Sequence, residues 1–73
     1  MSEIKRSVSI AGHRTSIALE PEFWDALKEI ARERDLSVSA LIAEVDAARG
    51  AANLSRALRL HVLAYFRARA LRT

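Results

Sequence analysis

The sequence predicts a mainly α-helical fold with a short β ribbon, completed by a second copy of the chain. Residues 7–19 alternate apolar and polar side chains and are rich in β-branched residues, which is typical of a strand. Three later segments repeat apolar residues at helical spacing. With 73 residues and no cysteine, the chain has neither a large core nor disulfides or thiolate metal ligands to support a small one. A second copy is the economical source of the missing core.

The predicted strand changes its inward face midway. Val8 and Ile10 occupy even positions, whereas Ile17 and Leu19 occupy odd positions. A slip of one residue moves every side chain to the other face of a sheet, so one regular strand cannot bury both pairs. The chain therefore needs either a bulge or a tight hairpin turn near Gly12, and the residues do not choose between them.

The first helix is predicted to start at Pro21 and to stop near Arg34 and Asp35. Proline suits the first helical position, where its missing N–H group costs nothing, and the acids on either side of it favour the positive end of the helix. The buried face is predicted to contain Phe23, Trp24, Leu27, Ile30 and Ala31.

Two further helices follow. Ser37 is a good N-cap for the second helix, and Gly50 is a natural stop. Asn53 can cap a third helix that runs to about Arg69. One side of the third helix gathers Leu54, Leu58, Val62 and Tyr65, and the other gathers Arg56, Arg59 and Arg67 with Leu60 and Leu63. The two leucines on the basic side indicate a subunit contact or ordinary exposed residues.

The chain divides into a flexible basic arm (residues 1–6), a core (7–50) and an additional basic amphipathic helix (51–73). A lone strand leaves its backbone N–H and C=O groups unpaired, and even a short hairpin is marginal in water. We therefore expect the strand to pair with its twin in a two-fold dimer. The shared core is predicted to contain Ile17, Leu19, Phe23, Leu27, Ile30, Leu41, Ile42 and Val45.

The net charge is +3, but positive and negative residues are strongly segregated along the chain. Residues 1–19 carry three basic residues and one acid, residues 20–49 carry four basic residues and eight acids, and residues 50–73 carry five arginines and no acid. Basic ends on an acidic middle are typical of a chain whose ends contact a polyanion, although solvated helix faces can have the same composition.

Several function classes are not expected. No apolar run is long enough to span a membrane and no signal peptide is recognisable, so we expect a cytoplasmic protein. The two histidines, His13 and His61, do not have metal-ligand spacing, and we expect neither a metal nor a cofactor. No catalytic or nucleotide-binding motif is present, and the chain is small for an enzyme pocket.

Two segments resemble a known family. Thr15-Ser-Ile-Ala-Leu-Glu-Pro-Glu-Phe-Trp-Asp-Ala-Leu-Lys-Glu-Ile-Ala and Asp35-Leu-Ser-Val-Ser-Ala-Leu-Ile-Ala-Glu are similar to ribbon-helix-helix DNA-binding domains of the Arc and MetJ type. The preceding Gly12-His-Arg-Thr-Ser resembles a small bacterial subgroup of that family. The resemblance implies an intertwined homodimer whose antiparallel ribbon enters the major groove of DNA.

The resemblance also implies which residues contact DNA. The outward residues of the strand would be Arg14, Ser16 and Ala18, with Arg14 able to bind guanine and Ser16 either kind of base edge. The backbone N–H groups near Ser37, Val38 and Ser39 would hold a phosphate.

The flanks add further candidates, and one residue departs from the family pattern. Lys5 and Arg6 would add phosphate contacts from the arm, and His13 would bind an anion or stabilise the turn. Ala18 stands where related chains present a long polar residue, and it can touch a thymine methyl group but cannot donate a hydrogen bond.

The first hypothesis is accordingly a homodimeric, non-enzymatic DNA-binding protein, a transcriptional regulator that acts as a repressor. The second is a protein-interaction or antitoxin-like module with weak or no sequence-specific DNA binding. In the second case, Leu60 and Leu63 would hold a partner or build a tetramer through the third helix.

Overall fold

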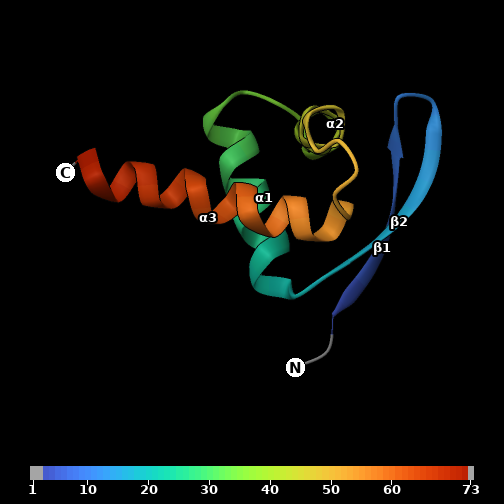
Figure 1. The fold of residues 1–73 in the computed structure, drawn as a ribbon, viewed down its shortest axis with the longest axis horizontal. Coiled ribbons are helices and arrows are strands. Elements are labelled where there is room, and N and C mark those ends of the chain that lie inside the picture. The colour runs from blue at the N-terminus through green and yellow to red at the C-terminus, as the bar shows by residue number, and fades with distance from the viewer. Residues whose placement is uncertain (1–2, 73) are drawn as a thin grey trace.

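A β hairpin lies along one side of the molecule and three helices fill the other (Figure 1). The computed structural model describes residues 3–72, with the backbone alone for residue 72. The elements are β1 (Ile4–Ile10), β2 (His13–Leu19), α1 (Pro21–Glu33), α2 (Val38–Ala48) and α3 (Leu54–Arg72). In this part of the chain, no helix is long and apolar enough to cross a membrane.

The change of parity in the predicted strand comes from a hairpin. Ala11 and Gly12 form the two-residue turn, with φ angles of +50° and +84°. Positive φ at both central residues is the requirement of a type I′ turn, whose twist matches that of the strands. The register pairs Val8 with Thr15 and Ile10 with His13, so even positions of β1 and odd positions of β2 share one face. Of the two alternatives near Gly12, the turn is present.

The partner strand of β2 is β1 of the same chain. The prediction of a single interrupted strand is therefore wrong, whereas pairing with a second copy stays a prediction. The sequence pattern does not predict the start of β1, because the adjacent charged residues Lys5 and Arg6 interrupt the alternation of apolar and polar residues. Residues 4–6 consequently belong to the ribbon, paired with residues 17–19, and not to a flexible arm. Residues 1–2 of that arm lie outside the described residues.

The helix boundaries follow the local signals. Pro21 opens α1. The hydroxyl Oγ of Ser37 accepts a hydrogen bond of 3.0 Å from the backbone N–H of Ala40, and Oδ1 of Asn53 accepts one of 3.1 Å from the N–H of Arg56. Gly50 has a φ of +64°, the left-handed conformation that ends a helix. These predicted caps and stops are confirmed, and α3 continues past the predicted end to Arg72.

One chain closes its own core. Leu58 and Val62 of α3 are buried beside residues of the hairpin, α1 and α2, so α3 covers apolar surface that was predicted to need a second copy. The predicted core residues are buried except Phe23, which is half-buried. The complete buried set is Ile10, Ile17, Leu19, Trp24, Leu27, Ile30, Ala31, Leu41, Ile42, Val45, Leu58 and Val62.

Candidate nucleic-acid interface

The hairpin presents one face to the helices and one to solvent. Apolar residues such as Ile10, Ile17 and Leu19 are buried on the inner face. The register places six other residues on the opposite face, which we call the outer ribbon face: Lys5, Ser7, Ser9, Arg14, Ser16 and Ala18. All six are exposed except Ala18, which is half-buried. The outer ribbon face has two cations and no carboxylate, and it leaves its backbone close to any ligand because its other side chains are short.

The outer ribbon face has one cation near each of its ends. Lys5 is opposite Ala18 near the open end of the hairpin, Ser7 is opposite Ser16, and Ser9 is opposite Arg14 beside the turn. At about 3.3 Å per residue, the two cations are about 13 Å apart along the ribbon. A two-stranded ribbon fits the major groove of B-DNA, which is about 12 Å wide.

Trp24 of α1 fixes the open end of the hairpin. Its indole Nε1–H donates a hydrogen bond of 2.9 Å to the backbone carbonyl of Ile4, and the side chain is only 2% exposed. The Arg6 guanidinium lies over the ring, 5.3 Å from the centroid, in a cation–π contact. Arg6 is thus held on the inner side of the hairpin and does not point outward with Lys5.

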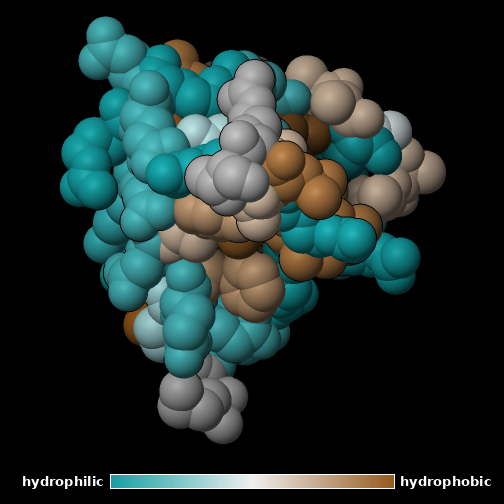
Figure 2. Space-filling model, turned by 90° about the vertical axis from the view of Figure 1, so that its left-hand side faces the viewer, coloured by the Kyte–Doolittle hydropathy of each residue, from teal (hydrophilic) through white to brown (hydrophobic). Residues whose placement is uncertain are grey.

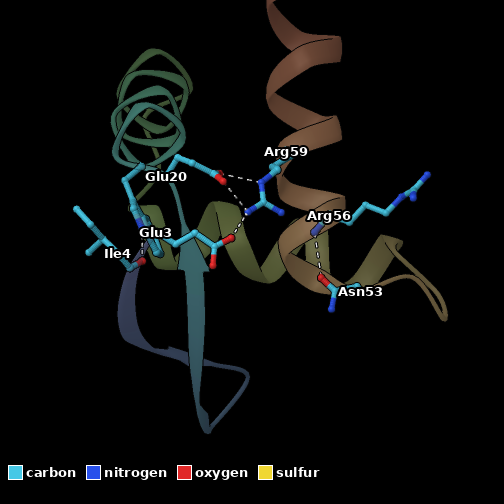
Figure 3. A network of polar contacts seen from close by, with 7 residues as sticks. Glu3, Ile4, Glu20, Asn53, Arg56 and Arg59 are labelled. Atoms are coloured by element: carbon cyan, nitrogen blue, oxygen red, sulfur yellow. Dashed lines mark hydrogen bonds and ion pairs between the residues drawn. The ribbon is translucent and has the colours of Figure 1, made fainter. Parts of the chain in front are cut away.

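Arg59 connects α3 to the same end of the molecule. It binds Glu20 at 2.9 Å and Glu3 at 2.7 Å (Figure 3). Its guanidinium also lies over the Phe23 ring. The hydrogen bond from Arg59 lowers the pKa of the Glu20 carboxyl below its ordinary value, and the same contact raises the pKa of Arg59. The sequence pattern groups Arg59 with the solvent-facing Arg56 and Arg67, and this grouping is wrong because Arg59 turns toward α1.

The structure separates the predicted strand contacts into two groups. Arg14, Ser16 and Ala18 share the outer ribbon face, as their alternation indicates. His13 is exposed beside the turn, but it is paired with Ile10 and so lies on the register of the inner face. Lys5 lies with Arg14 on the outer side, at the other end of the ribbon.

The start of α2 is the second predicted contact. The Ser37 hydroxyl is already used as the helix cap. The backbone N–H groups of Val38 and Ser39 are in the first turn, where an α-helix has no internal acceptor for them. These two donors and the exposed Ser39 hydroxyl can receive an anion.

Sequence reasoning missed Ser7 and Ser9. They precede the turn and share the outer ribbon face with Arg14 and Ser16. The signal is present, since Ser7-Val8-Ser9-Ile10 alternates polar and apolar residues as a half-buried strand does. A single interrupted strand over residues 7–19 leaves these serines without a defined face, and only the hairpin register places them beside Arg14.

Comparison with known proteins places this arrangement in a family. Residues 3–66 match the family described as a ribbon-helix-helix domain, which includes the hairpin, α1, α2 and most of α3. The chain belongs to the ribbon-helix-helix family. Ribbon-helix-helix domains are of the DNA-binding, regulatory type, and the match confirms the resemblance seen in the sequence.

A solved structure supports the same assignment. The chain is similar to an uncharacterized protein from Bordetella pertussis Tohama I, with a TM-score of 0.79 and 36% sequence identity. The similarity covers 94% of this ribbon-helix-helix chain and 59% of that protein. No curated protein matches the chain. Among residues 3–72, no group of three or more histidines and carboxylates could hold a metal ion.

Proposed function

We propose that the chain is a homodimeric DNA-binding protein, a transcriptional regulator of the repressor kind, that inserts its ribbon into the major groove. The observation that carries the proposal is the outer ribbon face, where two cations and three serines are exposed and no carboxylate is present. Such a surface pairs with base edges and phosphates without repulsion. The action takes place in the cytoplasm, at the nucleoid when the protein is on DNA.

Three residues of this surface and the start of α2 have defined roles in the proposal. Arg14 donates two hydrogen bonds to guanine O6 and N7, and Ser16 contacts a neighbouring base edge. Lys5, at the other end of the ribbon, binds a phosphate. The N–H groups of Val38 and Ser39 hold a second phosphate and set the register of the protein on the duplex.

The ribbon and the family support the proposed dimer. Ribbon-helix-helix proteins generally dimerise, and both long edges of this two-stranded hairpin are without a partner strand among residues 3–72. A second copy paired along one edge would satisfy those backbone groups and would extend the cationic surface. We expect light scattering after size exclusion to give twice the mass of 8.1 kDa.

The first prediction is that Arg14→Ala weakens DNA binding. Duplexes selected from a random pool by the full chain are labelled, and binding is followed by anisotropy at several salt concentrations. Losing a bidentate contact to guanine costs about 1–3 kcal/mol and relaxes sequence preference at that base.

Lys5→Ala is expected to remove a phosphate contact. It weakens binding to selected and to random duplexes equally, and it reduces the slope of log K against log salt by about 0.9.

Arg32→Ala is the matched control. Arg32 is an exposed arginine on α1, outside the outer ribbon face, so its removal changes the net charge by the same amount as Arg14→Ala. Equal losses for the two variants would mean that only overall charge matters, which contradicts a role for the ribbon. The absence of salt-dependent binding below millimolar concentration at low ionic strength would contradict DNA binding altogether.

A further inference from the structure

The side of α3 that faces away from the body carries exposed apolar residues. Leu60 is 49% exposed and Leu63 is 51% exposed, and Arg56 and Arg67 continue the same side of the helix at spacings of four residues. We call these four residues the α3 outer stripe. The ribbon view shows α3 along the front of the molecule, with its C-terminal part extending beyond α1 (Figure 1). The space-filling view toward that end shows brown and tan atoms gathered on one half, whereas the other half is largely teal (Figure 2).

A hollow adjoins this stripe. It has a volume of about 350 Å³ and lies between the end of α2 and the first half of α3, with Leu60 on its edge. The surface is mainly apolar, and its alanines leave room for side chains from outside. It is lined by Val45, Ala48, Arg49, Ala52, Ala57, Leu60 and His61. His61 Nε2 is buried here and has no hydrogen-bond partner, which is costly for a polar atom.

The charges around the stripe are not balanced by the rest of the chain. Helix α3 contains no carboxylate. Arg59 and Arg69 turn to the glutamates of α1 and its start, whereas the Arg56 and Arg67 side chains have no ion-pair partner among the described residues. The close view shows the Arg56 side chain extending away from Glu3 and Glu20 (Figure 3).

The carboxylates of α2 do not supply the missing charge. Glu44 is bound to Arg34 at 2.6 Å, and Asp46 is bound to Arg49 at 2.7 Å. An occupant of the hollow that carries its own acids would therefore meet two cations free to pair with it, Arg56 and Arg67.

A second copy of the chain does not fit this surface. Another α3 would bring two more unpaired arginines against the first two, and like charges in contact destabilise an interface. Helix α1 has two exposed acids, Glu22 and Asp25, without an ion pair among the described residues, but it carries no exposed large apolar residue of its own. On residues 3–72 the exposed large apolar side chains are Ile4, Leu60, Leu63 and Leu71. DNA is also a poor occupant, because phosphates gain nothing from contact with leucines and an apolar hollow.

We propose that the hollow between α2 and α3, together with the α3 outer stripe, binds an acidic amphipathic helix of another protein. Apolar side chains of that helix enter the hollow beside Leu60 and cover Leu63 of the stripe. Its carboxylates pair with Arg56 and Arg67 on the same side of α3. This binding mode is a helix in an apolar groove, in which two or three apolar residues per two turns give affinity and the flanking charges give orientation. The inference stands apart from the DNA-binding proposal, because the two surfaces share no residue.

The test uses the full chain and a synthetic peptide. The probe is a fluorescein-labelled 18-residue helix with leucines along one face and glutamates elsewhere, and a scrambled peptide of the same composition is the reference. Anisotropy gives the dissociation constant, and amide chemical shifts of the labelled protein map the contact. We expect tighter binding of the amphipathic peptide, with shifts concentrated at residues 45–67.

Variants separate the apolar and the charged contributions. Leu60→Ser and Leu63→Ser are each expected to weaken peptide binding about fivefold, because about half of each leucine remains to be buried. Arg67→Glu is expected to weaken it about fivefold or more at low salt, whereas Arg32→Glu, an equal charge reversal on α1, leaves it unchanged. Arg14→Ala also leaves peptide binding unchanged. The peptide-binding proposal can therefore hold even if the DNA-binding proposal fails.

Four results would overturn the inference. The first is equal affinity for the scrambled peptide, and the second is unchanged affinity in Leu60→Ser and Leu63→Ser variants that keep the wild-type circular dichroism. The third is a loss of mass by light scattering in those variants, which would identify the stripe as an interface between copies of this chain. Loss of selected-DNA binding in Arg67→Glu but not in Arg32→Glu, without a change in peptide binding, would assign the surface to nucleic acid instead.

Discussion

At the scale of single residues, Arg59 joins three parts of the molecule. Its guanidinium binds Glu20 before α1 and Glu3 before β1, while its own backbone is in α3. Because the group is about one-third exposed, water and salt weaken each ion pair. The contribution of Arg59 therefore depends on solution conditions, unlike that of the buried apolar residues beneath it.

We predict that Arg59→Met removes part of the acid sensitivity of the fold. The folded pKa of Glu20 is below its ordinary value of 4.5 because Arg59 hydrogen-bonds the carboxylate. The folded chain therefore binds fewer protons than the unfolded chain, and the stabilisation is present above about pH 4.5 and lost as the pH falls below it. Urea midpoints at pH 7 and pH 3 should differ less in Arg59→Met than in the wild type.

Two other carboxyls leave some acid sensitivity in that variant. Hydrogen bonds from Tyr65 and from Arg34 lower the pKa of Glu33 and of Glu44, respectively. Arg56→Met is the control, since it removes the same charge from the same helix but breaks no ion pair among residues 3–72. If Arg56→Met flattens the pH dependence as much as Arg59→Met, the effect comes from net charge and not from the contact with Glu20.

At the scale of elements, the turn of the hairpin places a non-glycine residue in an unfavourable backbone conformation. Ala11 has a φ of +50°, a conformation that costs an ordinary L-residue about 1–2 kcal/mol and that asparagine tolerates better. We predict that Ala11→Asn raises the free energy of unfolding by about 0.5–1 kcal/mol, measured by urea denaturation. Ala47→Asn, at an exposed position inside α2, should instead lower it by about 0.5 kcal/mol. Equal effects at the two positions would contradict the role assigned to the turn.

The elements also differ in how far the sequence could predict them. The helix ends depend on short-range chemistry, such as Ser37 and Asn53 as caps, and they could be read locally. The hairpin could not, because Ala-Gly is a weak turn signal compared with Asn-Gly or Asp-Gly. The residues of the site also differ in this respect. The alternation of the strand predicts that Arg14 and Ser16 share its outward face. The Glu20–Arg59 ion pair has no sequence signature, because it joins residues 39 positions apart.

At the scale of the whole molecule, the core is complete within one chain, and α3 is part of it. Leu58 has no exposed surface, whereas Leu63, five residues later on the same helix, is 51% exposed. Leu58→Ala is predicted to reduce the free energy of unfolding by about 2–5 kcal/mol because it leaves a cavity under α3. Leu63→Ala is predicted to change it by less than about 0.5 kcal/mol. Similar losses in the two variants would show that α3 packs differently in solution.

A core that is complete within one chain also means that folding does not depend on dimerisation. An intertwined dimer shares its core, so its chains unfold when they separate. Here Leu27, Ile30, Leu41 and Ile42 have no exposed surface in a single chain, and the proposed dimer joins chains that are already folded. We predict that dilution through the dimer–monomer transition, followed by analytical ultracentrifugation, leaves helix content and the emission of Trp24 unchanged. Trp24 is the single tryptophan and is buried against the hairpin, so its emission reports on the ribbon. A loss of helix content in step with dissociation would instead mean that the two chains share their core.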